Sequence, residues 1–310
     1  MSQKLPTTLQ EAVKYFAEPQ RCLDFVVALR WPNGPTCPRC QSPEHRFIKT
    51  RSLWECKLCK KQYSVKVGTI FEDSAIKLDK WLCAIWMIVN AKNGVSSYEV
   101  ARNLGVTQKT AWFMMHRIRL ALSKGSLDRK LMGEVEVDET YIGGKARNMH
   151  AGKRKDLVKV EGSFRKAVVV GMLERKGEVR AEVLTRASRK LIQSAVNKHV
   201  VLGSSLMTDE LGLYRTVGKD YAHQVINHAQ KYVEGNVYTN GIENFWSLLK
   251  RGIKGTYVSV EPFHLFRYLD EQSFRFNTRK TNDQGRFMEA VSSINGKRVQ
   301  YQELIGQTTH

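Results

Sequence analysis

Two cysteine pairs constrain the fold of this chain more than any other feature of its sequence. Cys37-Pro-Arg-Cys40 and Cys56-Lys-Leu-Cys59 are CxxC pairs separated by fifteen residues, which is the spacing of a four-cysteine zinc ribbon. The surrounding segment is short and rich in turns, with too few apolar residues for a core of its own, so bound Zn²⁺ would supply folding free energy. Because four protein ligands leave no open coordination position, we expect a structural zinc.

An excess of basic residues indicates a polyanionic partner. The 310 residues include 50 Lys and Arg against 30 Asp and Glu, a formal net charge of +20. Such an excess attracts nucleic acid and makes its binding salt-dependent; a basic enzyme without such a partner is the alternative. No apolar run reaches the ~18 residues of a membrane span, and the N-terminus lacks the layout of a secretory signal. We therefore expect a cytoplasmic protein with no membrane partner.

The apolar periodicity of residues 76–128 predicts three helices. The run Leu78–Asn90 has helix length and a wide apolar face, and helices follow at Ser97–Leu104 and at 107–123, separated by a Gly-Val-Thr turn. This layout is typical of a helix-turn-helix whose second helix begins at the Thr107 cap, although an ordinary helical hairpin shares the pattern. The side chains expected to reach DNA from the second helix are Gln108, Lys109, Trp112, His116 and Arg117.

From residue 131 onward the pattern changes to strands. Two hairpin-linked strands, in KAVVVGMLER and KGEVRAEVLT, follow the strand in GEVEVDETYIGG, and helices then alternate with strands. This order predicts a mixed sheet flanked by helices. The chain is therefore expected to be multi-domain, of α+β and α/β class, with a helical lead (1–34), a zinc ribbon (35–75), a helix-turn-helix unit (76–128), a sheet domain (131–285) and a C-terminal tail (286–310).

Three acidic residues lie on separate predicted elements of the sheet domain. Asp138 lies on a strand, Asp209 ends another, and Glu243 begins a long helix on which Lys250 shares its face two turns later. A strand carboxylate at a sheet centre is energetically costly unless it binds something. Carboxylates from separated elements are what two-metal phosphoryl transfer requires, and oxygen ligands suit Mg²⁺ or Mn²⁺. Lys250 would contact a DNA phosphate, and Arg251 is a further expected DNA contact.

Neighbouring residues leave the ligand assignment open. Glu136, Glu139 and Glu210 are close enough in sequence to be confused with the ligands, and Asn240, one turn before Glu243, could coordinate through its amide oxygen. Each acid taken singly is also compatible with a solvated surface position.

Two further features accompany the predicted acids. Residues 144–166 contain eight Lys or Arg against two acids, and a basic loop of this kind would track the DNA backbone through Lys153, Arg154 and Lys155; a solvated loop with no such role is the alternative. Phe245 and Trp246 follow Glu243 and could stack on an unpaired base. Packing of the helix against the sheet is the preferred interpretation of these two aromatic residues.

Motifs along nearly the whole chain resemble those of the ISXO-type insertion-sequence transposases of bacteria. In order, they are RWPNGPTCPRC, WECKLCKKQYSVKVGTIF, VEVDETYIGG, MTDE, TNGIENFWSLLKRGIKGTY and YLDEQSFRFNTR. The resemblance implies a ribonuclease-H-like catalytic domain of the DDE superfamily, with Asp138 and Asp209 as the first two acids, Glu243 as the third and Lys250 as the associated lysine.

The third acid is the variable position of the family. Because some relatives carry asparagine there, the resemblance leaves Asn240 and Asn244 as alternatives to Glu243. We retain Glu243 as the expected ligand.

The resemblance also implies a function and its partners. A transposase of this type binds the terminal inverted repeats of its element, cleaves the 3′ ends and joins them to target DNA by two-metal-ion phosphoryl transfer. Because two ends must be held together, a homodimer or larger assembly on nucleoid DNA is expected. A catalytically inactive zinc-ribbon and helix-turn-helix regulator is the alternative, and a structure-selective nuclease such as a resolvase or RNase H is another.

Overall fold

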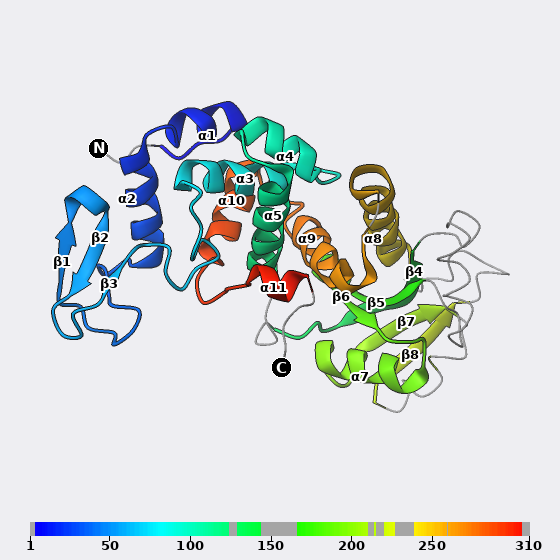
Figure 1. The fold of residues 1–310 in the computed structure, drawn as a ribbon. Helices are drawn as coiled ribbons and strands as arrows, with labels where there is room; N and C mark the ends of the chain where they lie inside the picture. Colours follow the sequence, from blue (N-terminus) through cyan, green and yellow to red (C-terminus); the bar gives the residue numbers. More distant parts are fainter. Residues whose placement is uncertain are drawn as a thin grey trace. The chain divides into compact units, whose positions relative to one another are not determined.

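The polypeptide divides into two units in the computed structural model (Figure 1). Unit 1 contains Met1–Ser123 together with Thr278–His310, and unit 2 contains Lys124–Asn277. The structure describes residues 4–123, 129–143, 166–209, 214, 220–226, 239–258 and 260–305. The sheet-containing unit therefore ends at residue 277 rather than at the expected 285, and the expected C-terminal tail belongs to the N-terminal unit.

Helices form most of unit 1, and local capping explains where they begin. Thr8 and Glu11 make a capping box at the helix that begins at Leu9, and Ser96 with Glu99 makes another at the helix that begins at Ser97. Gly105 ends the helix of residues 97–104 in the left-handed conformation, with φ of 59°. The N-terminal helices are α1 (Leu9–Tyr15), α2 (Pro19–Arg30), α3 (Leu78–Asn90), α4 (Ser97–Leu104) and α5 (Gln108–Leu122).

Two C-terminal helices complete unit 1, namely α10 (Asp283–Ser292) and α11 (Tyr301–Leu304). Phe287 of α10 is buried, and its ring centroid lies 5.7 Å from that of Phe16, 6.0 Å from Phe25 and 5.0 Å from Trp86. These aromatic contacts join segments more than 200 residues apart in sequence. The C-terminal residues are thus part of the core of unit 1 rather than a tail.

A small antiparallel sheet forms the remainder of unit 1. Its strands are β1 (His45–Ile48), β2 (Leu53–Cys56) and β3 (Gln62–Tyr63), in the order β1-β2-β3. The core of this sheet is aromatic: Trp54 stacks on Tyr63 and meets Trp31 edge-on, with centroids 5.3 Å apart for the latter pair. Because this core buries little apolar area, a bound metal ion would be an important source of stability for it.

Unit 2 is built on the predicted mixed sheet. Its described strands are ordered β6-β5-β4-β7-β8. The β4–β5 and β5–β6 pairs are antiparallel, whereas β4–β7 and β7–β8 are parallel. The strands are β4 (Glu134–Ile142), β5 (Ala167–Glu174), β6 (Val179–Leu184), β7 (Ser205–Asp209) and β8 (Ala222–Ile226).

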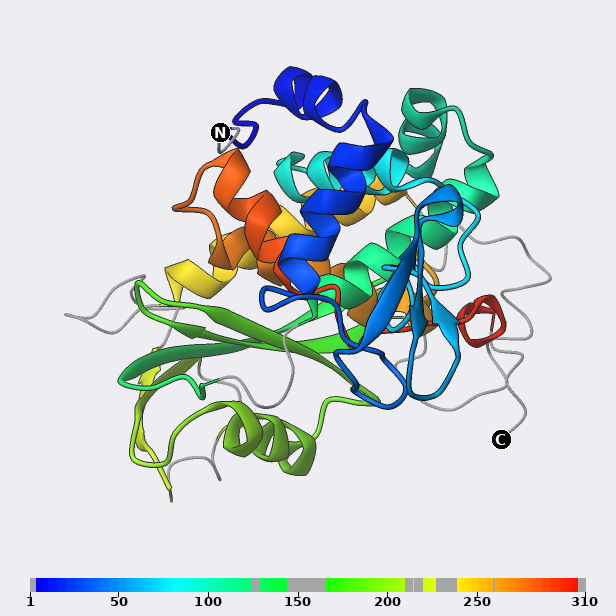
Figure 2. The ribbon, with the colours of Figure 1, turned by 90° about the vertical axis from the view of Figure 1, so that its left-hand side faces the viewer.

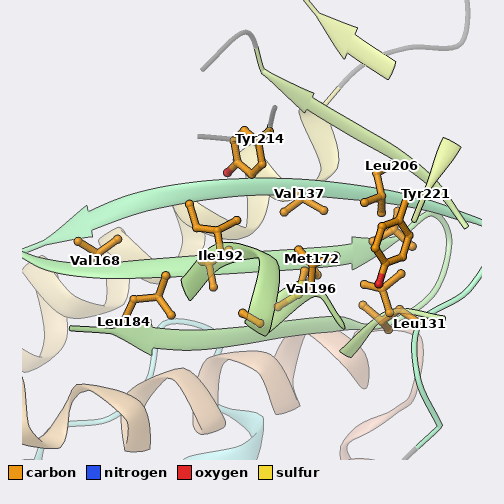
Figure 3. Close-up of a cluster of buried hydrophobic side chains, with 14 residues drawn as sticks. Leu131, Val137, Val168, Met172, Leu184, Ile192, Val196, Leu206, Tyr214 and Tyr221 are labelled. Carbon is orange, nitrogen blue, oxygen red and sulfur yellow. The ribbon is translucent and has the colours of Figure 1, made fainter. Parts of the chain in front are cut away.

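Helices cover both faces of this sheet (Figure 2). α7 (Arg189–His199) packs Ile192 and Val196 against Val137 of β4 and its neighbours on one face (Figure 3). α8 (Asn240–Arg251) and α9 (Leu265–Asn277) cover the opposite face, and α8 continues into a π-helix over Gly252–Tyr257. The central strand β4 is therefore enclosed on both sides, so any polar side chain on it needs a partner.

In the part of the chain that the structure describes, no helix combines the length and the apolar character needed to cross a bilayer.

Candidate functional site

The four cysteines of the CxxC pairs converge in unit 1. Their sulfur atoms all lie within 4.8 Å of one another. Cys37 Sγ lies 3.7 Å from Cys59 Sγ, and Cys40 Sγ lies 3.5 Å from Cys56 Sγ. A tetrahedral zinc with Zn–S bonds of ~2.3 Å requires sulfur–sulfur separations of about 3.8 Å. The cluster therefore fits a four-cysteine zinc ion.

Both CxxC pairs have the same local backbone. The Gln41 N–H donates to the Cys37 carbonyl at 2.9 Å, and the Lys60 N–H donates to the Cys56 carbonyl at 3.0 Å. Gln41 and Lys60 are left-handed, with φ of 59° and 58°, and the tight turn directs both sulfurs of a pair to one side. The Cys59 N–H also donates to Cys56 Sγ, which lowers the pKa of Cys56 to about 6 and favours the zinc-binding thiolate.

The start of α5 presents some of the side chains expected to contact DNA. Lys109 is exposed, and Gln108 and Trp112 are partly exposed. Gln108 Nε2 donates to the Ser97 hydroxyl of α4 at 2.9 Å. Lys109 Nζ lies 4.7 Å from the ring centroid of Tyr301 in α11, a cation–π contact. The C-terminal helix thus touches the same end of α5.

The expectation that His116 and Arg117 are available to DNA is wrong. Their exposed fractions are 0% and 4%. Arg117 donates to the carbonyl of Ile70 at 3.0 Å and to that of Glu72. Its guanidinium therefore satisfies backbone oxygens of the loop that precedes α3. The sequence shows a basic residue on a helix, but it does not show that a distant loop supplies acceptors.

Three residues expected to contact DNA, Lys153, Arg154 and Lys155, lie outside the described residues, as does the alternative acid Glu210. Arg251 is exposed at the end of α8, and Lys250 beside it is partly buried.

The first two predicted acids lie on adjacent parallel strands of unit 2. The register of β4 and β7 pairs Glu136 with Met207, and Asp138 and Asp209 each lie two residues further along these strands. Because side chains alternate along a strand, both carboxylates are then on the sheet face covered by α8. The two carboxylates also interact electrostatically, because the charge of Asp209 contributes to the raised pKa of Asp138.

Asp138 is half-buried and held at both oxygens. The Glu139 N–H donates to Oδ1 at 2.8 Å, and the Trp246 indole N–H donates to Oδ2 at 2.9 Å. Burial, followed by the charges of Glu139 and Asp209, raises the pKa of Asp138 to about 7. A carboxylate in these surroundings favours a bound proton or a cation.

Glu139 adds a third carboxylate beside the two aspartates. Its Oε2 accepts a hydrogen bond from the Tyr214 hydroxyl group. Burial raises the pKa of Glu139, and Asp209 adds to the effect. By strand alternation, however, Glu139 belongs to the face opposite Asp138.

Glu243, the expected third acid, lies in the first turn of α8 and is exposed. The Thr239 hydroxyl donates to its Oε1 at 3.1 Å. Within the described residues, only the four cysteines bring three or more metal-ligand atoms within 4.8 Å of one another. The structure therefore does not bring Glu243 to that distance from both aspartates. The alternatives Asn240 and Asn244 are exposed on the same helix.

Glu136, an alternative ligand in the sequence, has other partners. It is 1% exposed; its Oε2 accepts the Ile242 N–H at 2.9 Å, and Arg175 Nε donates to its Oε1 at 3.3 Å. A carboxylate at a helix N-terminus binds unsatisfied N–H groups and stabilises the helix dipole. A Cβ on Gly241 would lie 2.8 Å from Glu136 Oε2, so glycine permits this approach. Glu136 therefore anchors α8.

Sequence reasoning missed the pairing of Trp246 with Asp138. Gly171 of β5 pairs with Asp138, and a Cβ there would lie 2.5 Å from the Trp246 ring. The one available signal was a glycine inside the apolar run AVVVGMLE, which often marks a close approach to a strand. The partner of that approach is not encoded locally.

Comparison with known proteins defines the class of this chain. Residues 19–62 match the transposase zinc-ribbon domain, and residues 130–277 match the ISXO2-like transposase domain. The two matches together span more than half of the chain, and the protein is a zinc-ribbon transposase. It belongs to the family of ISXO2-like transposases, which confirms the family predicted from its motifs.

One relative comes from a transposable element. It is described as an uncharacterized protein in transposable element ISH50 of Halobacterium salinarum. The two sequences are 24% identical over 252 residues, which cover 77% of this chain and 84% of the relative.

Proposed function

We propose that this transposase cleaves the 3′ ends of its element and joins them to target DNA at a site containing Asp138 and Asp209. The observation that carries the proposal is the placement of these two carboxylates across adjacent parallel strands, with burial and acidic neighbours raising the pKa of Asp138. Like charges held together in this way favour divalent cations.

The donor set consists of carboxylate oxygens, which suits Mg²⁺ or Mn²⁺. Two such ions would activate the attacking oxygen and stabilise the leaving oxygen. Asp138 and Asp209 would hold them from the sheet, and Glu243 would complete the set from α8, with Asn240 and Asn244 as alternatives. Lys250 and Arg251, near the end of the same helix, would bind the DNA phosphates.

The remaining parts of the mechanism belong to the same proposal. A mixed sheet with three antiparallel strands, two parallel strands and helices on both faces supports a ribonuclease-H-like assignment for unit 2. In unit 1, α4 and α5 would form the helix-turn-helix that binds terminal inverted repeats, through Gln108, Lys109 and Trp112. Because two ends must be joined, the active form would be a homodimer or larger assembly on DNA.

The test uses the zinc-loaded full chain, a labelled terminal-repeat duplex and Mg²⁺. We expect 3′-end cleavage by the parent and a loss of about 100-fold or more in Asp138→Asn and Asp209→Asn, because each removes a metal ligand. Asp220→Asn changes an exposed carboxylate of the same unit and is expected to cleave like the parent.

The outcomes of this test distinguish an active transposase from the two alternative functions. Cleavage that survives Asp138→Asn would overturn the proposed active site. Repeat-specific binding by the parent without any cleavage would instead favour the inactive DNA-binding regulator, and cleavage without preference for the repeat would favour a structure-selective nuclease.

A further inference from the structure

The indole of Trp246 occupies a defined place between α8 and the sheet. The side chain is 4% exposed. Its ring lies so close to Gly171 that a Cβ there would come within 2.5 Å of it, and Gly171 is the β5 partner of Asp138. Its N–H donates to Asp138 Oδ2 at 2.9 Å. The ring thus packs beside Asp138 while its one donor holds that carboxylate.

The hydrogen bonds to Asp138 leave it able to bind a cation. An ionised carboxylate offers about four acceptor positions. The Trp246 indole and the Glu139 N–H occupy one on each oxygen. Two donors on different oxygens fix the plane of the carboxylate, and the remaining acceptor positions are available for an ion shared with Asp209.

The position of Trp246 is fixed in turn by the start of α8. Glu136 binds the Ile242 N–H, and Asp138 binds the Trp246 indole. Two residues of a strand span ~6.7 Å, and four residues of a helix rise ~6 Å, so the two spacings match. The two bonds therefore hold α8 along β4 at two points, one turn of the helix apart.

We propose that Trp246 is a positioning residue for the divalent-cation site: its N–H orients Asp138 and couples that carboxylate to the seating of the helix that carries Glu243. The proposal rests on the two-metal function proposed above. It assigns to the indole nitrogen a role beyond packing, because packing alone would be satisfied by any aromatic ring of similar size. Hydrogen bonds from outer residues to a ligating carboxylate tune its affinity for metal.

The test compares Trp246→Phe with the parent, both as zinc-loaded full chains. Phenylalanine keeps an aromatic ring against Gly171 and removes the donor to Asp138. The probe is Mn²⁺ alone, with the free ion measured by electron paramagnetic resonance. We expect a 10- to 100-fold loss of Mn²⁺ affinity, an unchanged zinc content and a thermal unfolding curve close to that of the parent. Cleavage of terminal-repeat DNA is expected to recover at saturating Mn²⁺.

A spectroscopic readout accompanies the affinity measurement. Trp246 is the sole tryptophan of residues 124–277, so bound paramagnetic Mn²⁺ is expected to quench a component of the parent's fluorescence. That component should be absent from Trp246→Phe and should not be quenched in Asp138→Asn. Trp86→Phe removes a buried indole of unit 1 and is expected to keep both the quenching and the parent's Mn²⁺ affinity.

Gly171→Ala tests the same bond without changing the indole. The added methyl group would displace the ring, so we expect a comparable loss of Mn²⁺ affinity and no further loss in the double variant with Trp246→Phe, since both act on one interaction. This variant keeps the proposal testable if Trp246→Phe does not fold.

Parent affinity in both single variants would overturn the role of Trp246 and leave the proposed function intact. A parent protein that neither binds Mn²⁺ nor cleaves would overturn the proposed function and this inference together.

Discussion

Asp138 has hydrogen-bond partners that suit its ionised form and surroundings that oppose ionisation. Two N–H groups donate to its oxygens, yet burial and the charges of Glu139 and Asp209 raise its pKa to about 7. The carboxylate is therefore protonated in the metal-free protein under conditions where it is ionised in the unfolded chain. A cation bound at the proposed active site would remove this conflict and would link the stability of unit 2 to metal.

This linkage predicts a pH-dependent effect of Asp138→Asn in the absence of added Mg²⁺ or Mn²⁺. The folded parent holds the Asp138 proton up to about pH 7, whereas the unfolded chain releases it near 3.8. Stability is therefore lost as the pH rises across this window, and the whole loss is present above it. We expect Asp138→Asn to be more stable than the parent at pH 8 by on the order of 2–4 kcal/mol and nearly equal to it at pH 4, a comparison checked by thermal unfolding.

Added Mg²⁺ provides the control for this prediction. The ion should raise the unfolding temperature of the parent and leave Asp138→Asn unchanged, because only the parent retains the proposed ligand. A parent–variant difference that does not change between pH 4 and pH 8 would contradict the linkage.

At the scale of elements, sequence patterns predicted the bounds of helices and strands better than they predicted contacts between distant residues. The bounds of α3 and α4 agree with the predicted ranges, and Asp138 lies on the predicted strand. These features depend on neighbouring residues only. The Ile242 N–H that binds Glu136 is more than 100 residues away from it in sequence, as is the Asp138 carboxylate that binds Trp246.

The end of α8 shows the same limit. It passes into a π-helix ending at Tyr257, whose hydroxyl donates to the buried Glu271 carboxylate, which also pairs with Arg275. Nothing in the local sequence predicts this buried polar network, because its members meet only after α9 has packed beside α8. Periodicity alone extends α8 to about residue 253 and does not predict the π-helix.

The prediction for the elements concerns the effect of zinc removal on the zinc ribbon. We expect removal of zinc to unfold residues 37–63, because their small aromatic core buries little apolar area and the four sulfurs lie at distances suited to one ion. Hydrogen exchange should show lost protection in β1, β2 and β3, while β4 and α8 of unit 2 remain protected. DNA binding should weaken.

Cysteine variants distinguish zinc loss from other effects of a chelator. Cys56→Ser should reproduce the loss of protection, whereas Cys83→Ser, which changes a cysteine of α3 outside the cluster, should retain zinc. A folded ribbon in protein shown by atomic emission to lack zinc would refute the prediction.

For the whole molecule, the notable feature is that unit 1 is made from both ends of the described chain. Phe287 of α10 packs among Phe16, Phe25 and Trp86. Lys297 also donates to the carbonyls of Ala121 and Ser123 at 2.8 and 2.7 Å. Sequence patterns did not predict this closure, because an apolar face on a helix does not say which distant helix will cover it.

Phe287→Ala is expected to lower the free energy of unfolding of unit 1 by about 3–5 kcal/mol, since it opens a cavity among aromatic rings. Denaturant unfolding measures this loss. Tyr98→Ala is the control in the same unit: Tyr98 of α4 is 66% exposed, and its replacement should change stability by less than about 0.5 kcal/mol. Equal effects of the two substitutions would show that Phe287 does not contribute to the core.

The return of the chain into unit 1 also has a consequence during protein synthesis. The ribosome makes residues 1–123 first and must then add all of unit 2 before α10 emerges. At 5–20 residues per second this delay is on the order of ten to thirty seconds. During it, the rings of Phe16, Phe25 and Trp86 lack their final partner. Nascent chains that have not reached α10 would therefore depend on chaperones, and the transposase would acquire a complete unit 1 only after its sheet-containing unit had been translated.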